Sequence, residues 1–320
     1  MLLVVVCDVV QAADAKPALA PSEIVAAAPR GDWVAIAASD LLVMDLANGK
    51  RVVIQLMPPP FSQGWVGNIR KLAVAHWWDG TSINRVQDNY VVQWGDANGE
   101  DKARAKPLPV GLVRVPQNEY AMEAQAFRDY AIDNMQAVSV EDIVEELEKS
   151  DRPRKILEGL HKSDAYTTGT DFFVGWPLGG TDKAVWPVHC YGMVGVGRDM
   201  PPDTGTGAEL YTVIGHAPRH LDRNIALVGR VISGIEHLSS LPRGTGPLGF
   251  YEKPEERVMI TAIRIGTEVK DLPRFEYLST ESASFATYAD ARANRRDPFF
   301  IRPAGGADIC NIPVPVRVVK

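Results

Sequence analysis

The sequence has few cysteines, no excess of positive charge and no long apolar run. Its 34 lysines and arginines are outnumbered by 40 aspartates and glutamates, which leaves a net charge of −6 at pH 7. Proteins that bind nucleic acid present a basic surface, so this balance argues against a nucleic-acid partner. No stretch approaches the roughly 18 apolar residues that cross a bilayer, and we therefore expect no stable membrane insertion.

The composition is otherwise that of an ordinary globular protein. Of the 320 residues, 46% are hydrophobic and 23% are charged. A chain of this size has enough apolar material for a sizeable core. It fits one large domain with insertions or two small domains, and it leaves the oligomeric state open.

The first segment, residues 1–15, reads MLLVVVCDVVQAADA. Its short apolar run and small residues resemble the end of a secretory signal peptide, although the positively charged start of such a peptide is missing. Residues 16–30 are rich in Ala and Pro and indicate a linker. We interpret residues 1–39 as a signal remnant and linker, which predicts a periplasmic or otherwise exported protein. The alternative is an ordinary buried strand in a cytoplasmic protein.

The three cysteines are Cys7, Cys190 and Cys310. Cys7 lacks the small preceding residue of a lipoprotein attachment site, and it would leave with a signal peptide. Cys190 and Cys310 would remain, and in an oxidising compartment such a pair can form a disulfide between the core and the C-terminal tail. Two separate buried thiols, which behave as small apolar side chains, are the other interpretation.

Two segments predict pairs of short strands. Residues 40–56 read DLLVMDLANGKRVVIQL, two apolar runs around an Asn-Gly-Lys turn, which is a strong hairpin signal. Residues 82–86 and 90–93 alternate apolar and polar positions on either side of a Gln-Asp-Asn turn. This period of two places Arg85 and Gln93 as polar groups on a mainly apolar face. The intervening residues 63–76 have the apolar spacing of a helix.

The stretch from Asp79 to Asp96, DGTSINRVQDNYVVQWGD, resembles the signature of cyclophilin-type peptidyl-prolyl isomerases. Several fixed spacings agree at once, from the aspartate-glycine pair through the arginine to the glutamine before glycine-aspartate. The resemblance implies that Arg85 is the catalytic residue and that Gln93 lies beside it and binds substrate.

A second block, residues 188–235, resembles the later part of the same family. Its motifs GAELY (207–211), LDRN (221–224) and VGRVISGI (228–235) match the family's later loop, turn, strand and helix. The resemblance implies further substrate-binding residues at Tyr90, Val91, Val194, Glu209, Tyr211, His220 and Leu221. Gly195, Glu209 and Ile225 stand where the family most often has asparagine, glutamine and histidine, which predicts a reshaped pocket.

The chemistry expected of Arg85 follows from the X-Pro bond itself. Rotating this bond meets a barrier of roughly 18–20 kcal/mol, because the amide must lose its resonance. In the twisted state the prolyl nitrogen gains a lone pair, and a guanidinium held nearby donates a hydrogen bond that is strongest in that state. Arginine suits this task because it is always charged and geometrically stiff. An apolar pocket for the pyrrolidine ring is expected from Tyr90, Val91, Tyr211 and Leu221.

Two further segments lie outside the resemblance. Residues 100–187 have helical patterns at 119–135, 140–149 and 151–161, followed by a Gly/Thr-rich return over 164–181, and we interpret them as a helical insertion. Residues 271–320 are interpreted as a C-terminal extension with a helix at 279–295. The resemblance then implies a mainly β fold: a closed antiparallel eight-stranded cyclophilin-like barrel, capped by two helices and built from residues 40–99 and 188–270.

These patterns predict a peptidyl-prolyl cis-trans isomerase that acts on proline-containing peptides and on unfolded or secreted client proteins. The alternative is a non-catalytic peptide-binding module or chaperone that uses the same groove. No metal and no other cofactor is expected, since Pro218 breaks the helical spacing of His216 and His220.

Overall fold

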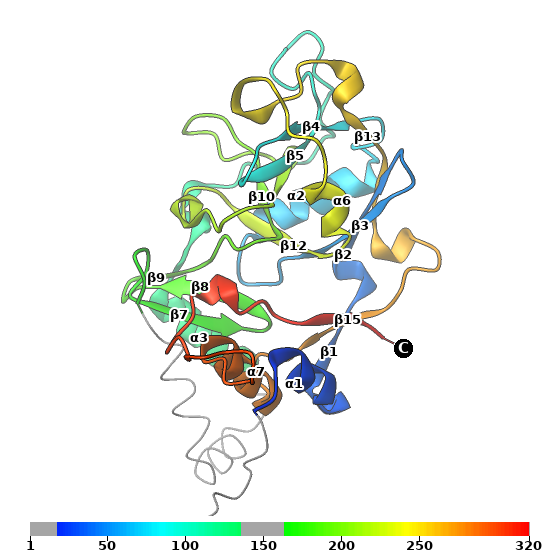
Figure 1. Ribbon diagram of the computed structural model, residues 1–320. Helices are drawn as coiled ribbons and strands as arrows, with labels where there is room; N and C mark the ends of the chain where they lie inside the picture. The colour runs from blue at the N-terminus through cyan, green and yellow to red at the C-terminus, as the bar shows by residue number, and fades with distance from the viewer. Residues whose placement is uncertain (1–17, 136–162, 320) are drawn as a thin grey trace, which may run out of the picture.

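The computed structural model describes residues 18–135 and 163–319. Strands close into an antiparallel barrel in the order β10-β11-β5-β4-β13-β2-β3-β12, which confirms the predicted fold class (Figure 1). Four of these strands come from residues 40–99 and four from residues 188–270. Their bounds are β2 Leu41–Leu46, β3 Arg51–Leu56, β4 Ser82–Val86, β5 Val91–Gly95, β10 Met193–Val196, β11 Leu210–Val213, β12 Leu227–Ser233 and β13 Val258–Ile265.

Both predicted hairpins are present in the barrel. Strands β2 and β3 pair across the Asn-Gly-Lys turn, where Gly49 has a φ of +78° that other residues seldom adopt. Strands β4 and β5 pair so that Arg85 lies opposite Gln93. The short turn between these two strands therefore fixes the relative position of the two polar side chains.

Two helices pack on the barrel core. Helix α2, Gln63–Val74, agrees with the helix predicted at 63–76 and buries Trp65, Ile69 and Leu72 completely. The short helix α6, Ile235–Ser239, adds the fully buried Leu238 to the same core. Full burial of each such side chain contributes about 1.5–3 kcal/mol, so this interior provides much of the stability of the barrel.

The insertion contains β-structure that the sequence did not predict. Helix α3, Ala124–Met135, agrees with part of the expected helical segment, but residues 164–181 do not form an irregular return. They supply β7, Gly169–Phe173, and β8, Trp176–Gly180, to a sheet ordered β6-β9-β8-β7, with β6 Met122–Glu123 and β9 Ala184–Pro187. The helices predicted at 140–149 and 151–161 lie outside the described residues.

The two ends of the described chain pack together against one another. The linker expected over residues 16–30 is wrong over residues 21–27, because these form helix α1, Pro21–Ala27. Strand β1 follows at Trp33–Ile36. Strand β1 pairs with β14, Phe275–Leu278, which pairs with β15, Val316–Val318. Helix α7, Ala283–Ala293, confirms the helix predicted at 279–295. Ile24 and Trp33 pack with Phe285 in one apolar cluster, which explains why an Ala/Pro-rich segment is ordered.

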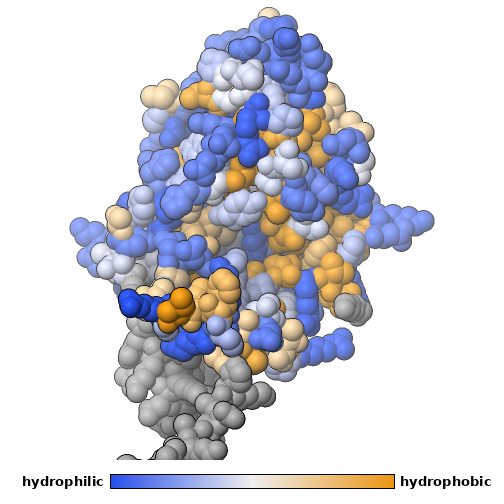
Figure 2. Space-filling model, in the orientation of Figure 1, coloured by the Kyte–Doolittle hydropathy of each residue, from blue (hydrophilic) through white to orange (hydrophobic). Residues whose placement is uncertain are grey.

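These added elements and the segments that connect them form an outer layer, which we define as residues 21–36, 122–135, 163–187 and 275–318. It contains α1, β1, α3, β6 to β9, β14, α7, β15 and the short turn at 309–311. Figure 1 shows this layer on one side of the barrel. Within it, the ring of Phe172 in the insertion lies 5.0 Å from that of Phe285 in the extension, between centroids. In Figure 2, hydrophilic residues cover the end of the barrel that points away from the outer layer. Hydrophobic residues lie mainly toward the junction between the barrel and the outer layer. In the described residues, no helix combines the length and the apolar character that crossing a membrane requires.

A buried arginine and a disulfide join the outer layer to the barrel. Arg230 of β12 donates from Nη1 to the carbonyl of Gly175 at 2.6 Å and lies over Trp176 at 4.6 Å. Burial lowers the pKa of Arg230 to about 10. Cys190, just before β10, is bonded to Cys310, 120 residues later, with 5.1 Å between the Cα atoms. In the structure the two cysteines are therefore paired and are not separate thiols.

The remaining elements are short turns of helix. They are η1 Arg30–Asp32, η2 Ala38–Asp40, η3 Gln117–Tyr120, η4 Arg219–Leu221, η5 Pro247–Gly249, η6 Pro254–Glu256, η7 Gly266–Glu268 and η8 Ile309–Asn311.

Candidate active site

Arg85 is held by three acceptors. Its Nε donates to the carbonyl of Leu248 at 2.8 Å, Nη1 donates to Oε1 of Gln93 at 3.1 Å, and Nη2 donates to Oε1 of Gln87. A guanidinium has five N–H groups, so one N–H on Nη1 and one on Nη2 have no acceptor among the described residues. The arginine is therefore fixed in orientation and still has two donors for a ligand.

Two aromatic rings flank the same guanidinium. The Cζ atom of Arg85 lies 5.8 Å from the ring centroid of Tyr90 and 5.5 Å from that of Phe250. Burial lowers the pKa of Arg85 and raises the pKa of Tyr90. The site thus combines partial removal of water with a cation–π contact on each ring, conditions under which a hydrogen bond from the cation is stronger.

The residues expected to hold a proline ring lie together beside Arg85. Val91, Tyr211 and Val213 form a small buried cluster on which Tyr90, Leu221 and Ile225 pack. The ring of His220 is stacked on Tyr90, with 6.2 Å between centroids and 12° between planes. We call this apolar group, with His220 at its edge, the pocket cluster.

One predicted residue lies elsewhere. The side chain of Val194 is 1% exposed and belongs to the interior core of the barrel. The pocket cluster contains Tyr90, Val91, Tyr211 and Leu221, but it does not contain Val194. Strand β10 therefore places the side chain of Val194 in the core and apart from the pocket cluster, and its contact with a substrate stays a prediction.

The unusual Gly195 is explained by Tyr211. These two residues lie opposite each other on β10 and β11, and a Cβ atom at position 195 would be 2.3 Å from the Tyr211 hydroxyl. The hydroxyl lies 2.9 Å from Nε2 of His189, whose Nδ1 lies 2.9 Å from Oδ1 of Asp222. The imidazole of His189 therefore lies between the Tyr211 hydroxyl and the carboxylate of Asp222, with one ring nitrogen at each. The space that an asparagine would need is thus filled by a hydrogen-bonded tyrosine.

Glu209 replaces the glutamine of the family pattern, and its surroundings explain how a carboxyl group can take the place of an amide. Its Oε1 accepts a hydrogen bond from the backbone N–H of Asp96 at 2.7 Å. Burial raises the pKa of Glu209 to about 8, and the nearby carboxylates of Asp96 and Glu100 act in the same direction, whereas hydrogen bonds from Asp96 N–H and Gln93 oppose the shift. At neutral pH the side chain is mainly the protonated acid. It then has one acceptor and one donor, as a glutamine amide does.

The sequence did not predict the other contacts of Arg85, which are made by Leu248, Phe250 and Gln87. Leu248 and Phe250 lie far along the chain from Arg85, and Leu248 is 163 residues later. Leu248 acts through its backbone carbonyl, which leaves no side-chain signal. Gln87 lies in the turn region next to β4, where the alternation of side chains offered a weak signal. Asp79, which belongs to the family pattern, forms a two-pronged ion pair with Arg264 at 2.7 Å and does not touch Arg85.

The site contains no metal-binding arrangement in the part of the chain that the structure describes. There, no three His, Cys, Asp or Glu side chains are grouped so that they could hold a metal ion. The arrangement that the structure does show is a fixed cation beside an apolar cluster, within a closed antiparallel barrel.

A family model for cyclophilin type peptidyl-prolyl cis-trans isomerase/CLD matches residues 44–265. This range is more than half of the chain, and the protein therefore belongs to the cyclophilin-type peptidyl-prolyl cis-trans isomerase family. The match begins within β2 and ends with β13, so it includes part of β2, the other seven strands of the barrel and the insertion between them. The family and the fold support peptidyl-prolyl isomerase activity in general.

One solved structure shows the same fold. The cyclophilin AquaCyp293 from Hirschia baltica is 19% identical, with 90% of this chain and 94% of that chain covered and a TM-score of 0.59. A cyclophilin type peptidyl-prolyl cis-trans isomerase from Cryptosporidium parvum, in the presence of the dipeptide Ala-Pro, is 10% identical over 70% of this chain and 98% of that chain, with a TM-score of 0.37. No curated protein matches the chain.

Proposed function

We propose that the protein catalyses cis-trans isomerisation of X-Pro peptide bonds and that Arg85 is its catalytic residue. The observation that carries this proposal is the state of the Arg85 guanidinium. Three of its N–H groups are bound by the protein, and two remain available beside the pocket cluster.

This geometry suits the electronic change in the twisted amide. The prolyl nitrogen becomes a hydrogen-bond acceptor only as the bond rotates, so a donor fixed beside it stabilises the transition state more than either planar state. Gln93 accepts from Nη1 of Arg85 and thereby fixes the direction of the donor. The pocket cluster holds the ring while the preceding residue turns.

The test is a protease-coupled isomerase assay on a tetrapeptide with a central X-Pro bond. Uncatalysed exchange takes about 10–100 s at 25 °C, so catalysis is seen as a faster phase. We expect the wild-type protein to accelerate this phase and Arg85→Ala to lose most of the acceleration. An intact wild-type protein without acceleration would contradict the proposal.

A second function is favoured by the altered residues of the groove. Gly195, Glu209 and Ile225 differ from the family pattern, and they would suit a peptide-binding module or chaperone without turnover. In that case Arg85→Ala would leave the affinity for a proline peptide nearly unchanged, and neither protein would show turnover.

We further propose that the protein acts outside the cytoplasm on unfolded or secreted clients. The bond between Cys190 and Cys310 supports this location, because disulfides persist in oxidising compartments. Locating the protein in fractionated cells, with its thiols blocked before lysis, tests this part. Free thiols in a cytoplasmic fraction would contradict it.

A further inference from the structure

The turn η4 forms one wall of the pocket cluster and has little stability of its own. It contains three residues, Arg219, His220 and Leu221, and such short turns of 3₁₀ helix have poor hydrogen-bond geometry. His220 and Leu221 face the pocket cluster, as their contacts with Tyr90 and the buried apolar side chains show. Arg219 is 3% exposed and contacts the outer layer. Something beyond the turn must therefore hold this wall in place.

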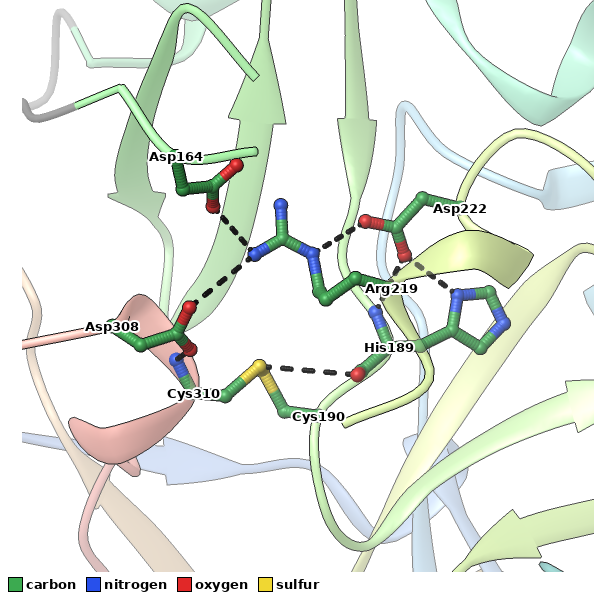
Figure 3. The surroundings of a disulfide bond; sticks show 7 residues. All are labelled: Asp164, His189, Cys190, Arg219, Asp222, Asp308 and Cys310. Atoms are coloured by element: carbon green, nitrogen blue, oxygen red, sulfur yellow. Dashed lines mark hydrogen bonds and ion pairs between the residues drawn. A yellow bond between two sulfur atoms is a disulfide. The ribbon is translucent and has the colours of Figure 1, made fainter. Parts of the chain in front are cut away.

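Arg219 ties the turn to the insertion and to the C-terminal extension. Its Nη1 lies 2.8 Å from Oδ2 of Asp164, in the insertion, and 3.8 Å from Oδ2 of Asp308, in the extension (Figure 3). Its Cζ lies 5.2 Å from the ring centroid of Tyr166. Asp164 is itself fixed, because its Oδ1 accepts hydrogen bonds from the backbone N–H groups of Tyr166 and Thr167.

The same arginine holds the other wall of the pocket through Asp222. Nε of Arg219 donates to Oδ2 of Asp222 at 2.6 Å, and Oδ1 of that aspartate accepts from the backbone N–H of His189 at 2.9 Å. The ring of His189 lies between Asp222 and the hydroxyl of Tyr211. One continuous series of contacts therefore joins the outer layer to both Leu221 and Tyr211.

The disulfide lies at the outer end of this series. Figure 3 shows Cys190, which follows His189, bonded to Cys310, while the backbone N–H of Cys310 donates to Asp308 at 2.8 Å. The bond thus holds the segment with Asp308 close to the segment with His189. Burial acts to lower the pKa of Arg219, but its hydrogen bonds to Asp222 and Asp164 outweigh burial, and the pKa is raised.

We propose that Arg219 is a positioning residue, through which the insertion and the C-terminal extension set the affinity of the pocket for its proline substrate. This inference rests on the proposed isomerase function and adds a role for the outer layer. Arg85 is linked to η4 by the ring of Tyr90, which contacts Arg85 on one side and is stacked on His220. The hydrogen bonds of Arg85 stand outside this series, because its acceptors are Gln93, Gln87 and the carbonyl of Leu248. Loosening the series should therefore raise KM and leave kcat nearly unchanged.

The test compares Asp164→Asn with Glu276→Gln. The first removes the charge that faces Arg219 from the insertion. The second removes an ion pair of similar length, Glu276 with Arg317 at 2.6 Å, which joins β14 and β15 inside the outer layer and does not reach η4. We expect Asp164→Asn to raise KM by about 2- to 30-fold, the range in which residues along a contact network change coupling. Glu276→Gln should leave KM unchanged.

A second measurement does not depend on catalysis. The backbone N–H groups of Asn224 and Ile225 both donate to the carbonyl of Leu221, so hydrogen exchange at these two amides reports the order of the pocket wall. Asp164→Asn and the double variant Cys190→Ser/Cys310→Ser should both exchange faster there, whereas Glu276→Gln should match the wild type. If the wild type shows no turnover, the isomerase proposal fails and the exchange rates still decide the positioning role. Wild-type exchange in both of the first two variants, or a loss confined to kcat, would overturn the inference.

Discussion

Arg85 and the pocket cluster are held in place by different parts of the molecule. Arg85 is oriented by Gln93 and by the carbonyl of Leu248, both within residues that belong to the barrel. The pocket cluster is connected to the outer layer by the ion pair of Arg219 with Asp164 and by the hydrogen bond between His189 and Tyr211. The hydrogen bonds that orient the arginine therefore come from the barrel part of the chain, whereas the cluster that would bind the ring is also tied to the added segments. The ring of Tyr90, which contacts both Arg85 and His220, lies between the two.

The same contrast is present in the residue types. The arginine and the glutamine of the family pattern are kept, whereas Gly195, Glu209 and Ile225 differ from it. Tyr211 with Gly195, and protonated Glu209 with Asp96, are local solutions that keep the groove packed and its polar groups paired. Changes at Arg85 and in the pocket cluster should accordingly have separable effects on kcat and on KM.

The largest expected effect comes from Arg85→Ala. Removing a donor that acts mainly in the transition state typically lowers kcat by about 10²–10³-fold, and we expect a loss of this size. Arg51→Ala is the matched control, because Arg51 pairs with Asp45 on the exposed edge of β3. Steady-state kinetics of both variants decide the matter. Equal activities of the Arg85→Ala and Arg51→Ala proteins would show that Arg85 contributes no more to turnover than an exposed arginine does.

A large effect on stability is expected from Gly195→Ala. The new Cβ would meet the ring and hydroxyl of Tyr211 at less than 3 Å, and overpacking of this kind costs roughly 1–3 kcal/mol. Gly67→Ala in helix α2 is the control, since a Cβ added there would have no heavy atom within 4 Å, and the change should stabilise the helix by about 0.5–1 kcal/mol. Urea denaturation measures both. A Gly195→Ala protein as stable as the wild type would show that Tyr211 is not fixed.

A smaller effect on turnover is expected from Phe250→Ala. The ring lies 5.5 Å from the guanidinium of Arg85, and a cation–π contact is worth about 0.5–2 kcal/mol. We expect a loss of kcat of about 2- to 30-fold with little change in KM, because the pocket cluster is untouched. Phe299→Ala, at a residue that is 84% exposed, is the control. A change confined to KM would assign Phe250 to binding.

How much the sequence predicts differs between Arg85 and the pocket cluster for a physical reason. Arg85 and Gln93 are eight residues apart on a hairpin, so alternation and turn length suffice to place them together. The contact of Arg219 with Asp164 joins segments 55 residues apart, and nothing local in the chain encodes it. The disulfide spans 120 residues, and the sequence offers it as one of two alternatives because Cys190 and Cys310 are the cysteines that remain without Cys7. The carbonyl of Leu248 is harder still to foresee, because any residue supplies one.

The outer layer was missed in part for a related reason. Pro21 and the alanines around it are typical of a linker, yet Ile24 and Trp33 bury against Phe285 near the other end of the chain. In the return segment, the alternation that makes β7 and β8 is masked by glycines and threonines, and pairing with β9 decides the structure. Tertiary contacts outweigh local preference in both segments.

The smallest effect at neutral pH is expected from Glu209→Gln, because the protonated acid and the amide offer similar groups. The folded-state pKa of Glu209 is about 8, above its ordinary 4.5, so between these values the folded protein binds more protons than the unfolded chain. The stability of the wild type relative to Glu209→Gln should therefore be highest near pH 4.5 and below, fall as the pH rises toward 8, and level off above it. Urea denaturation of both proteins from about pH 5 to about pH 9 measures this difference. A constant difference would show that Glu209 is ionised throughout.

The central claim is that Arg85 accelerates the rotation of a bound X-Pro bond. Exchange spectroscopy by NMR measures the interconversion of the cis and trans forms of a proline peptide at equilibrium, without a coupling protease. With a catalytic amount of the wild-type protein, we expect exchange cross-peaks between the two forms, and with Arg85→Ala we expect these cross-peaks to disappear while the peptide still binds. Cross-peaks of equal intensity with both proteins would contradict the role of Arg85, and binding without cross-peaks in the wild type would make the groove a peptide-binding site.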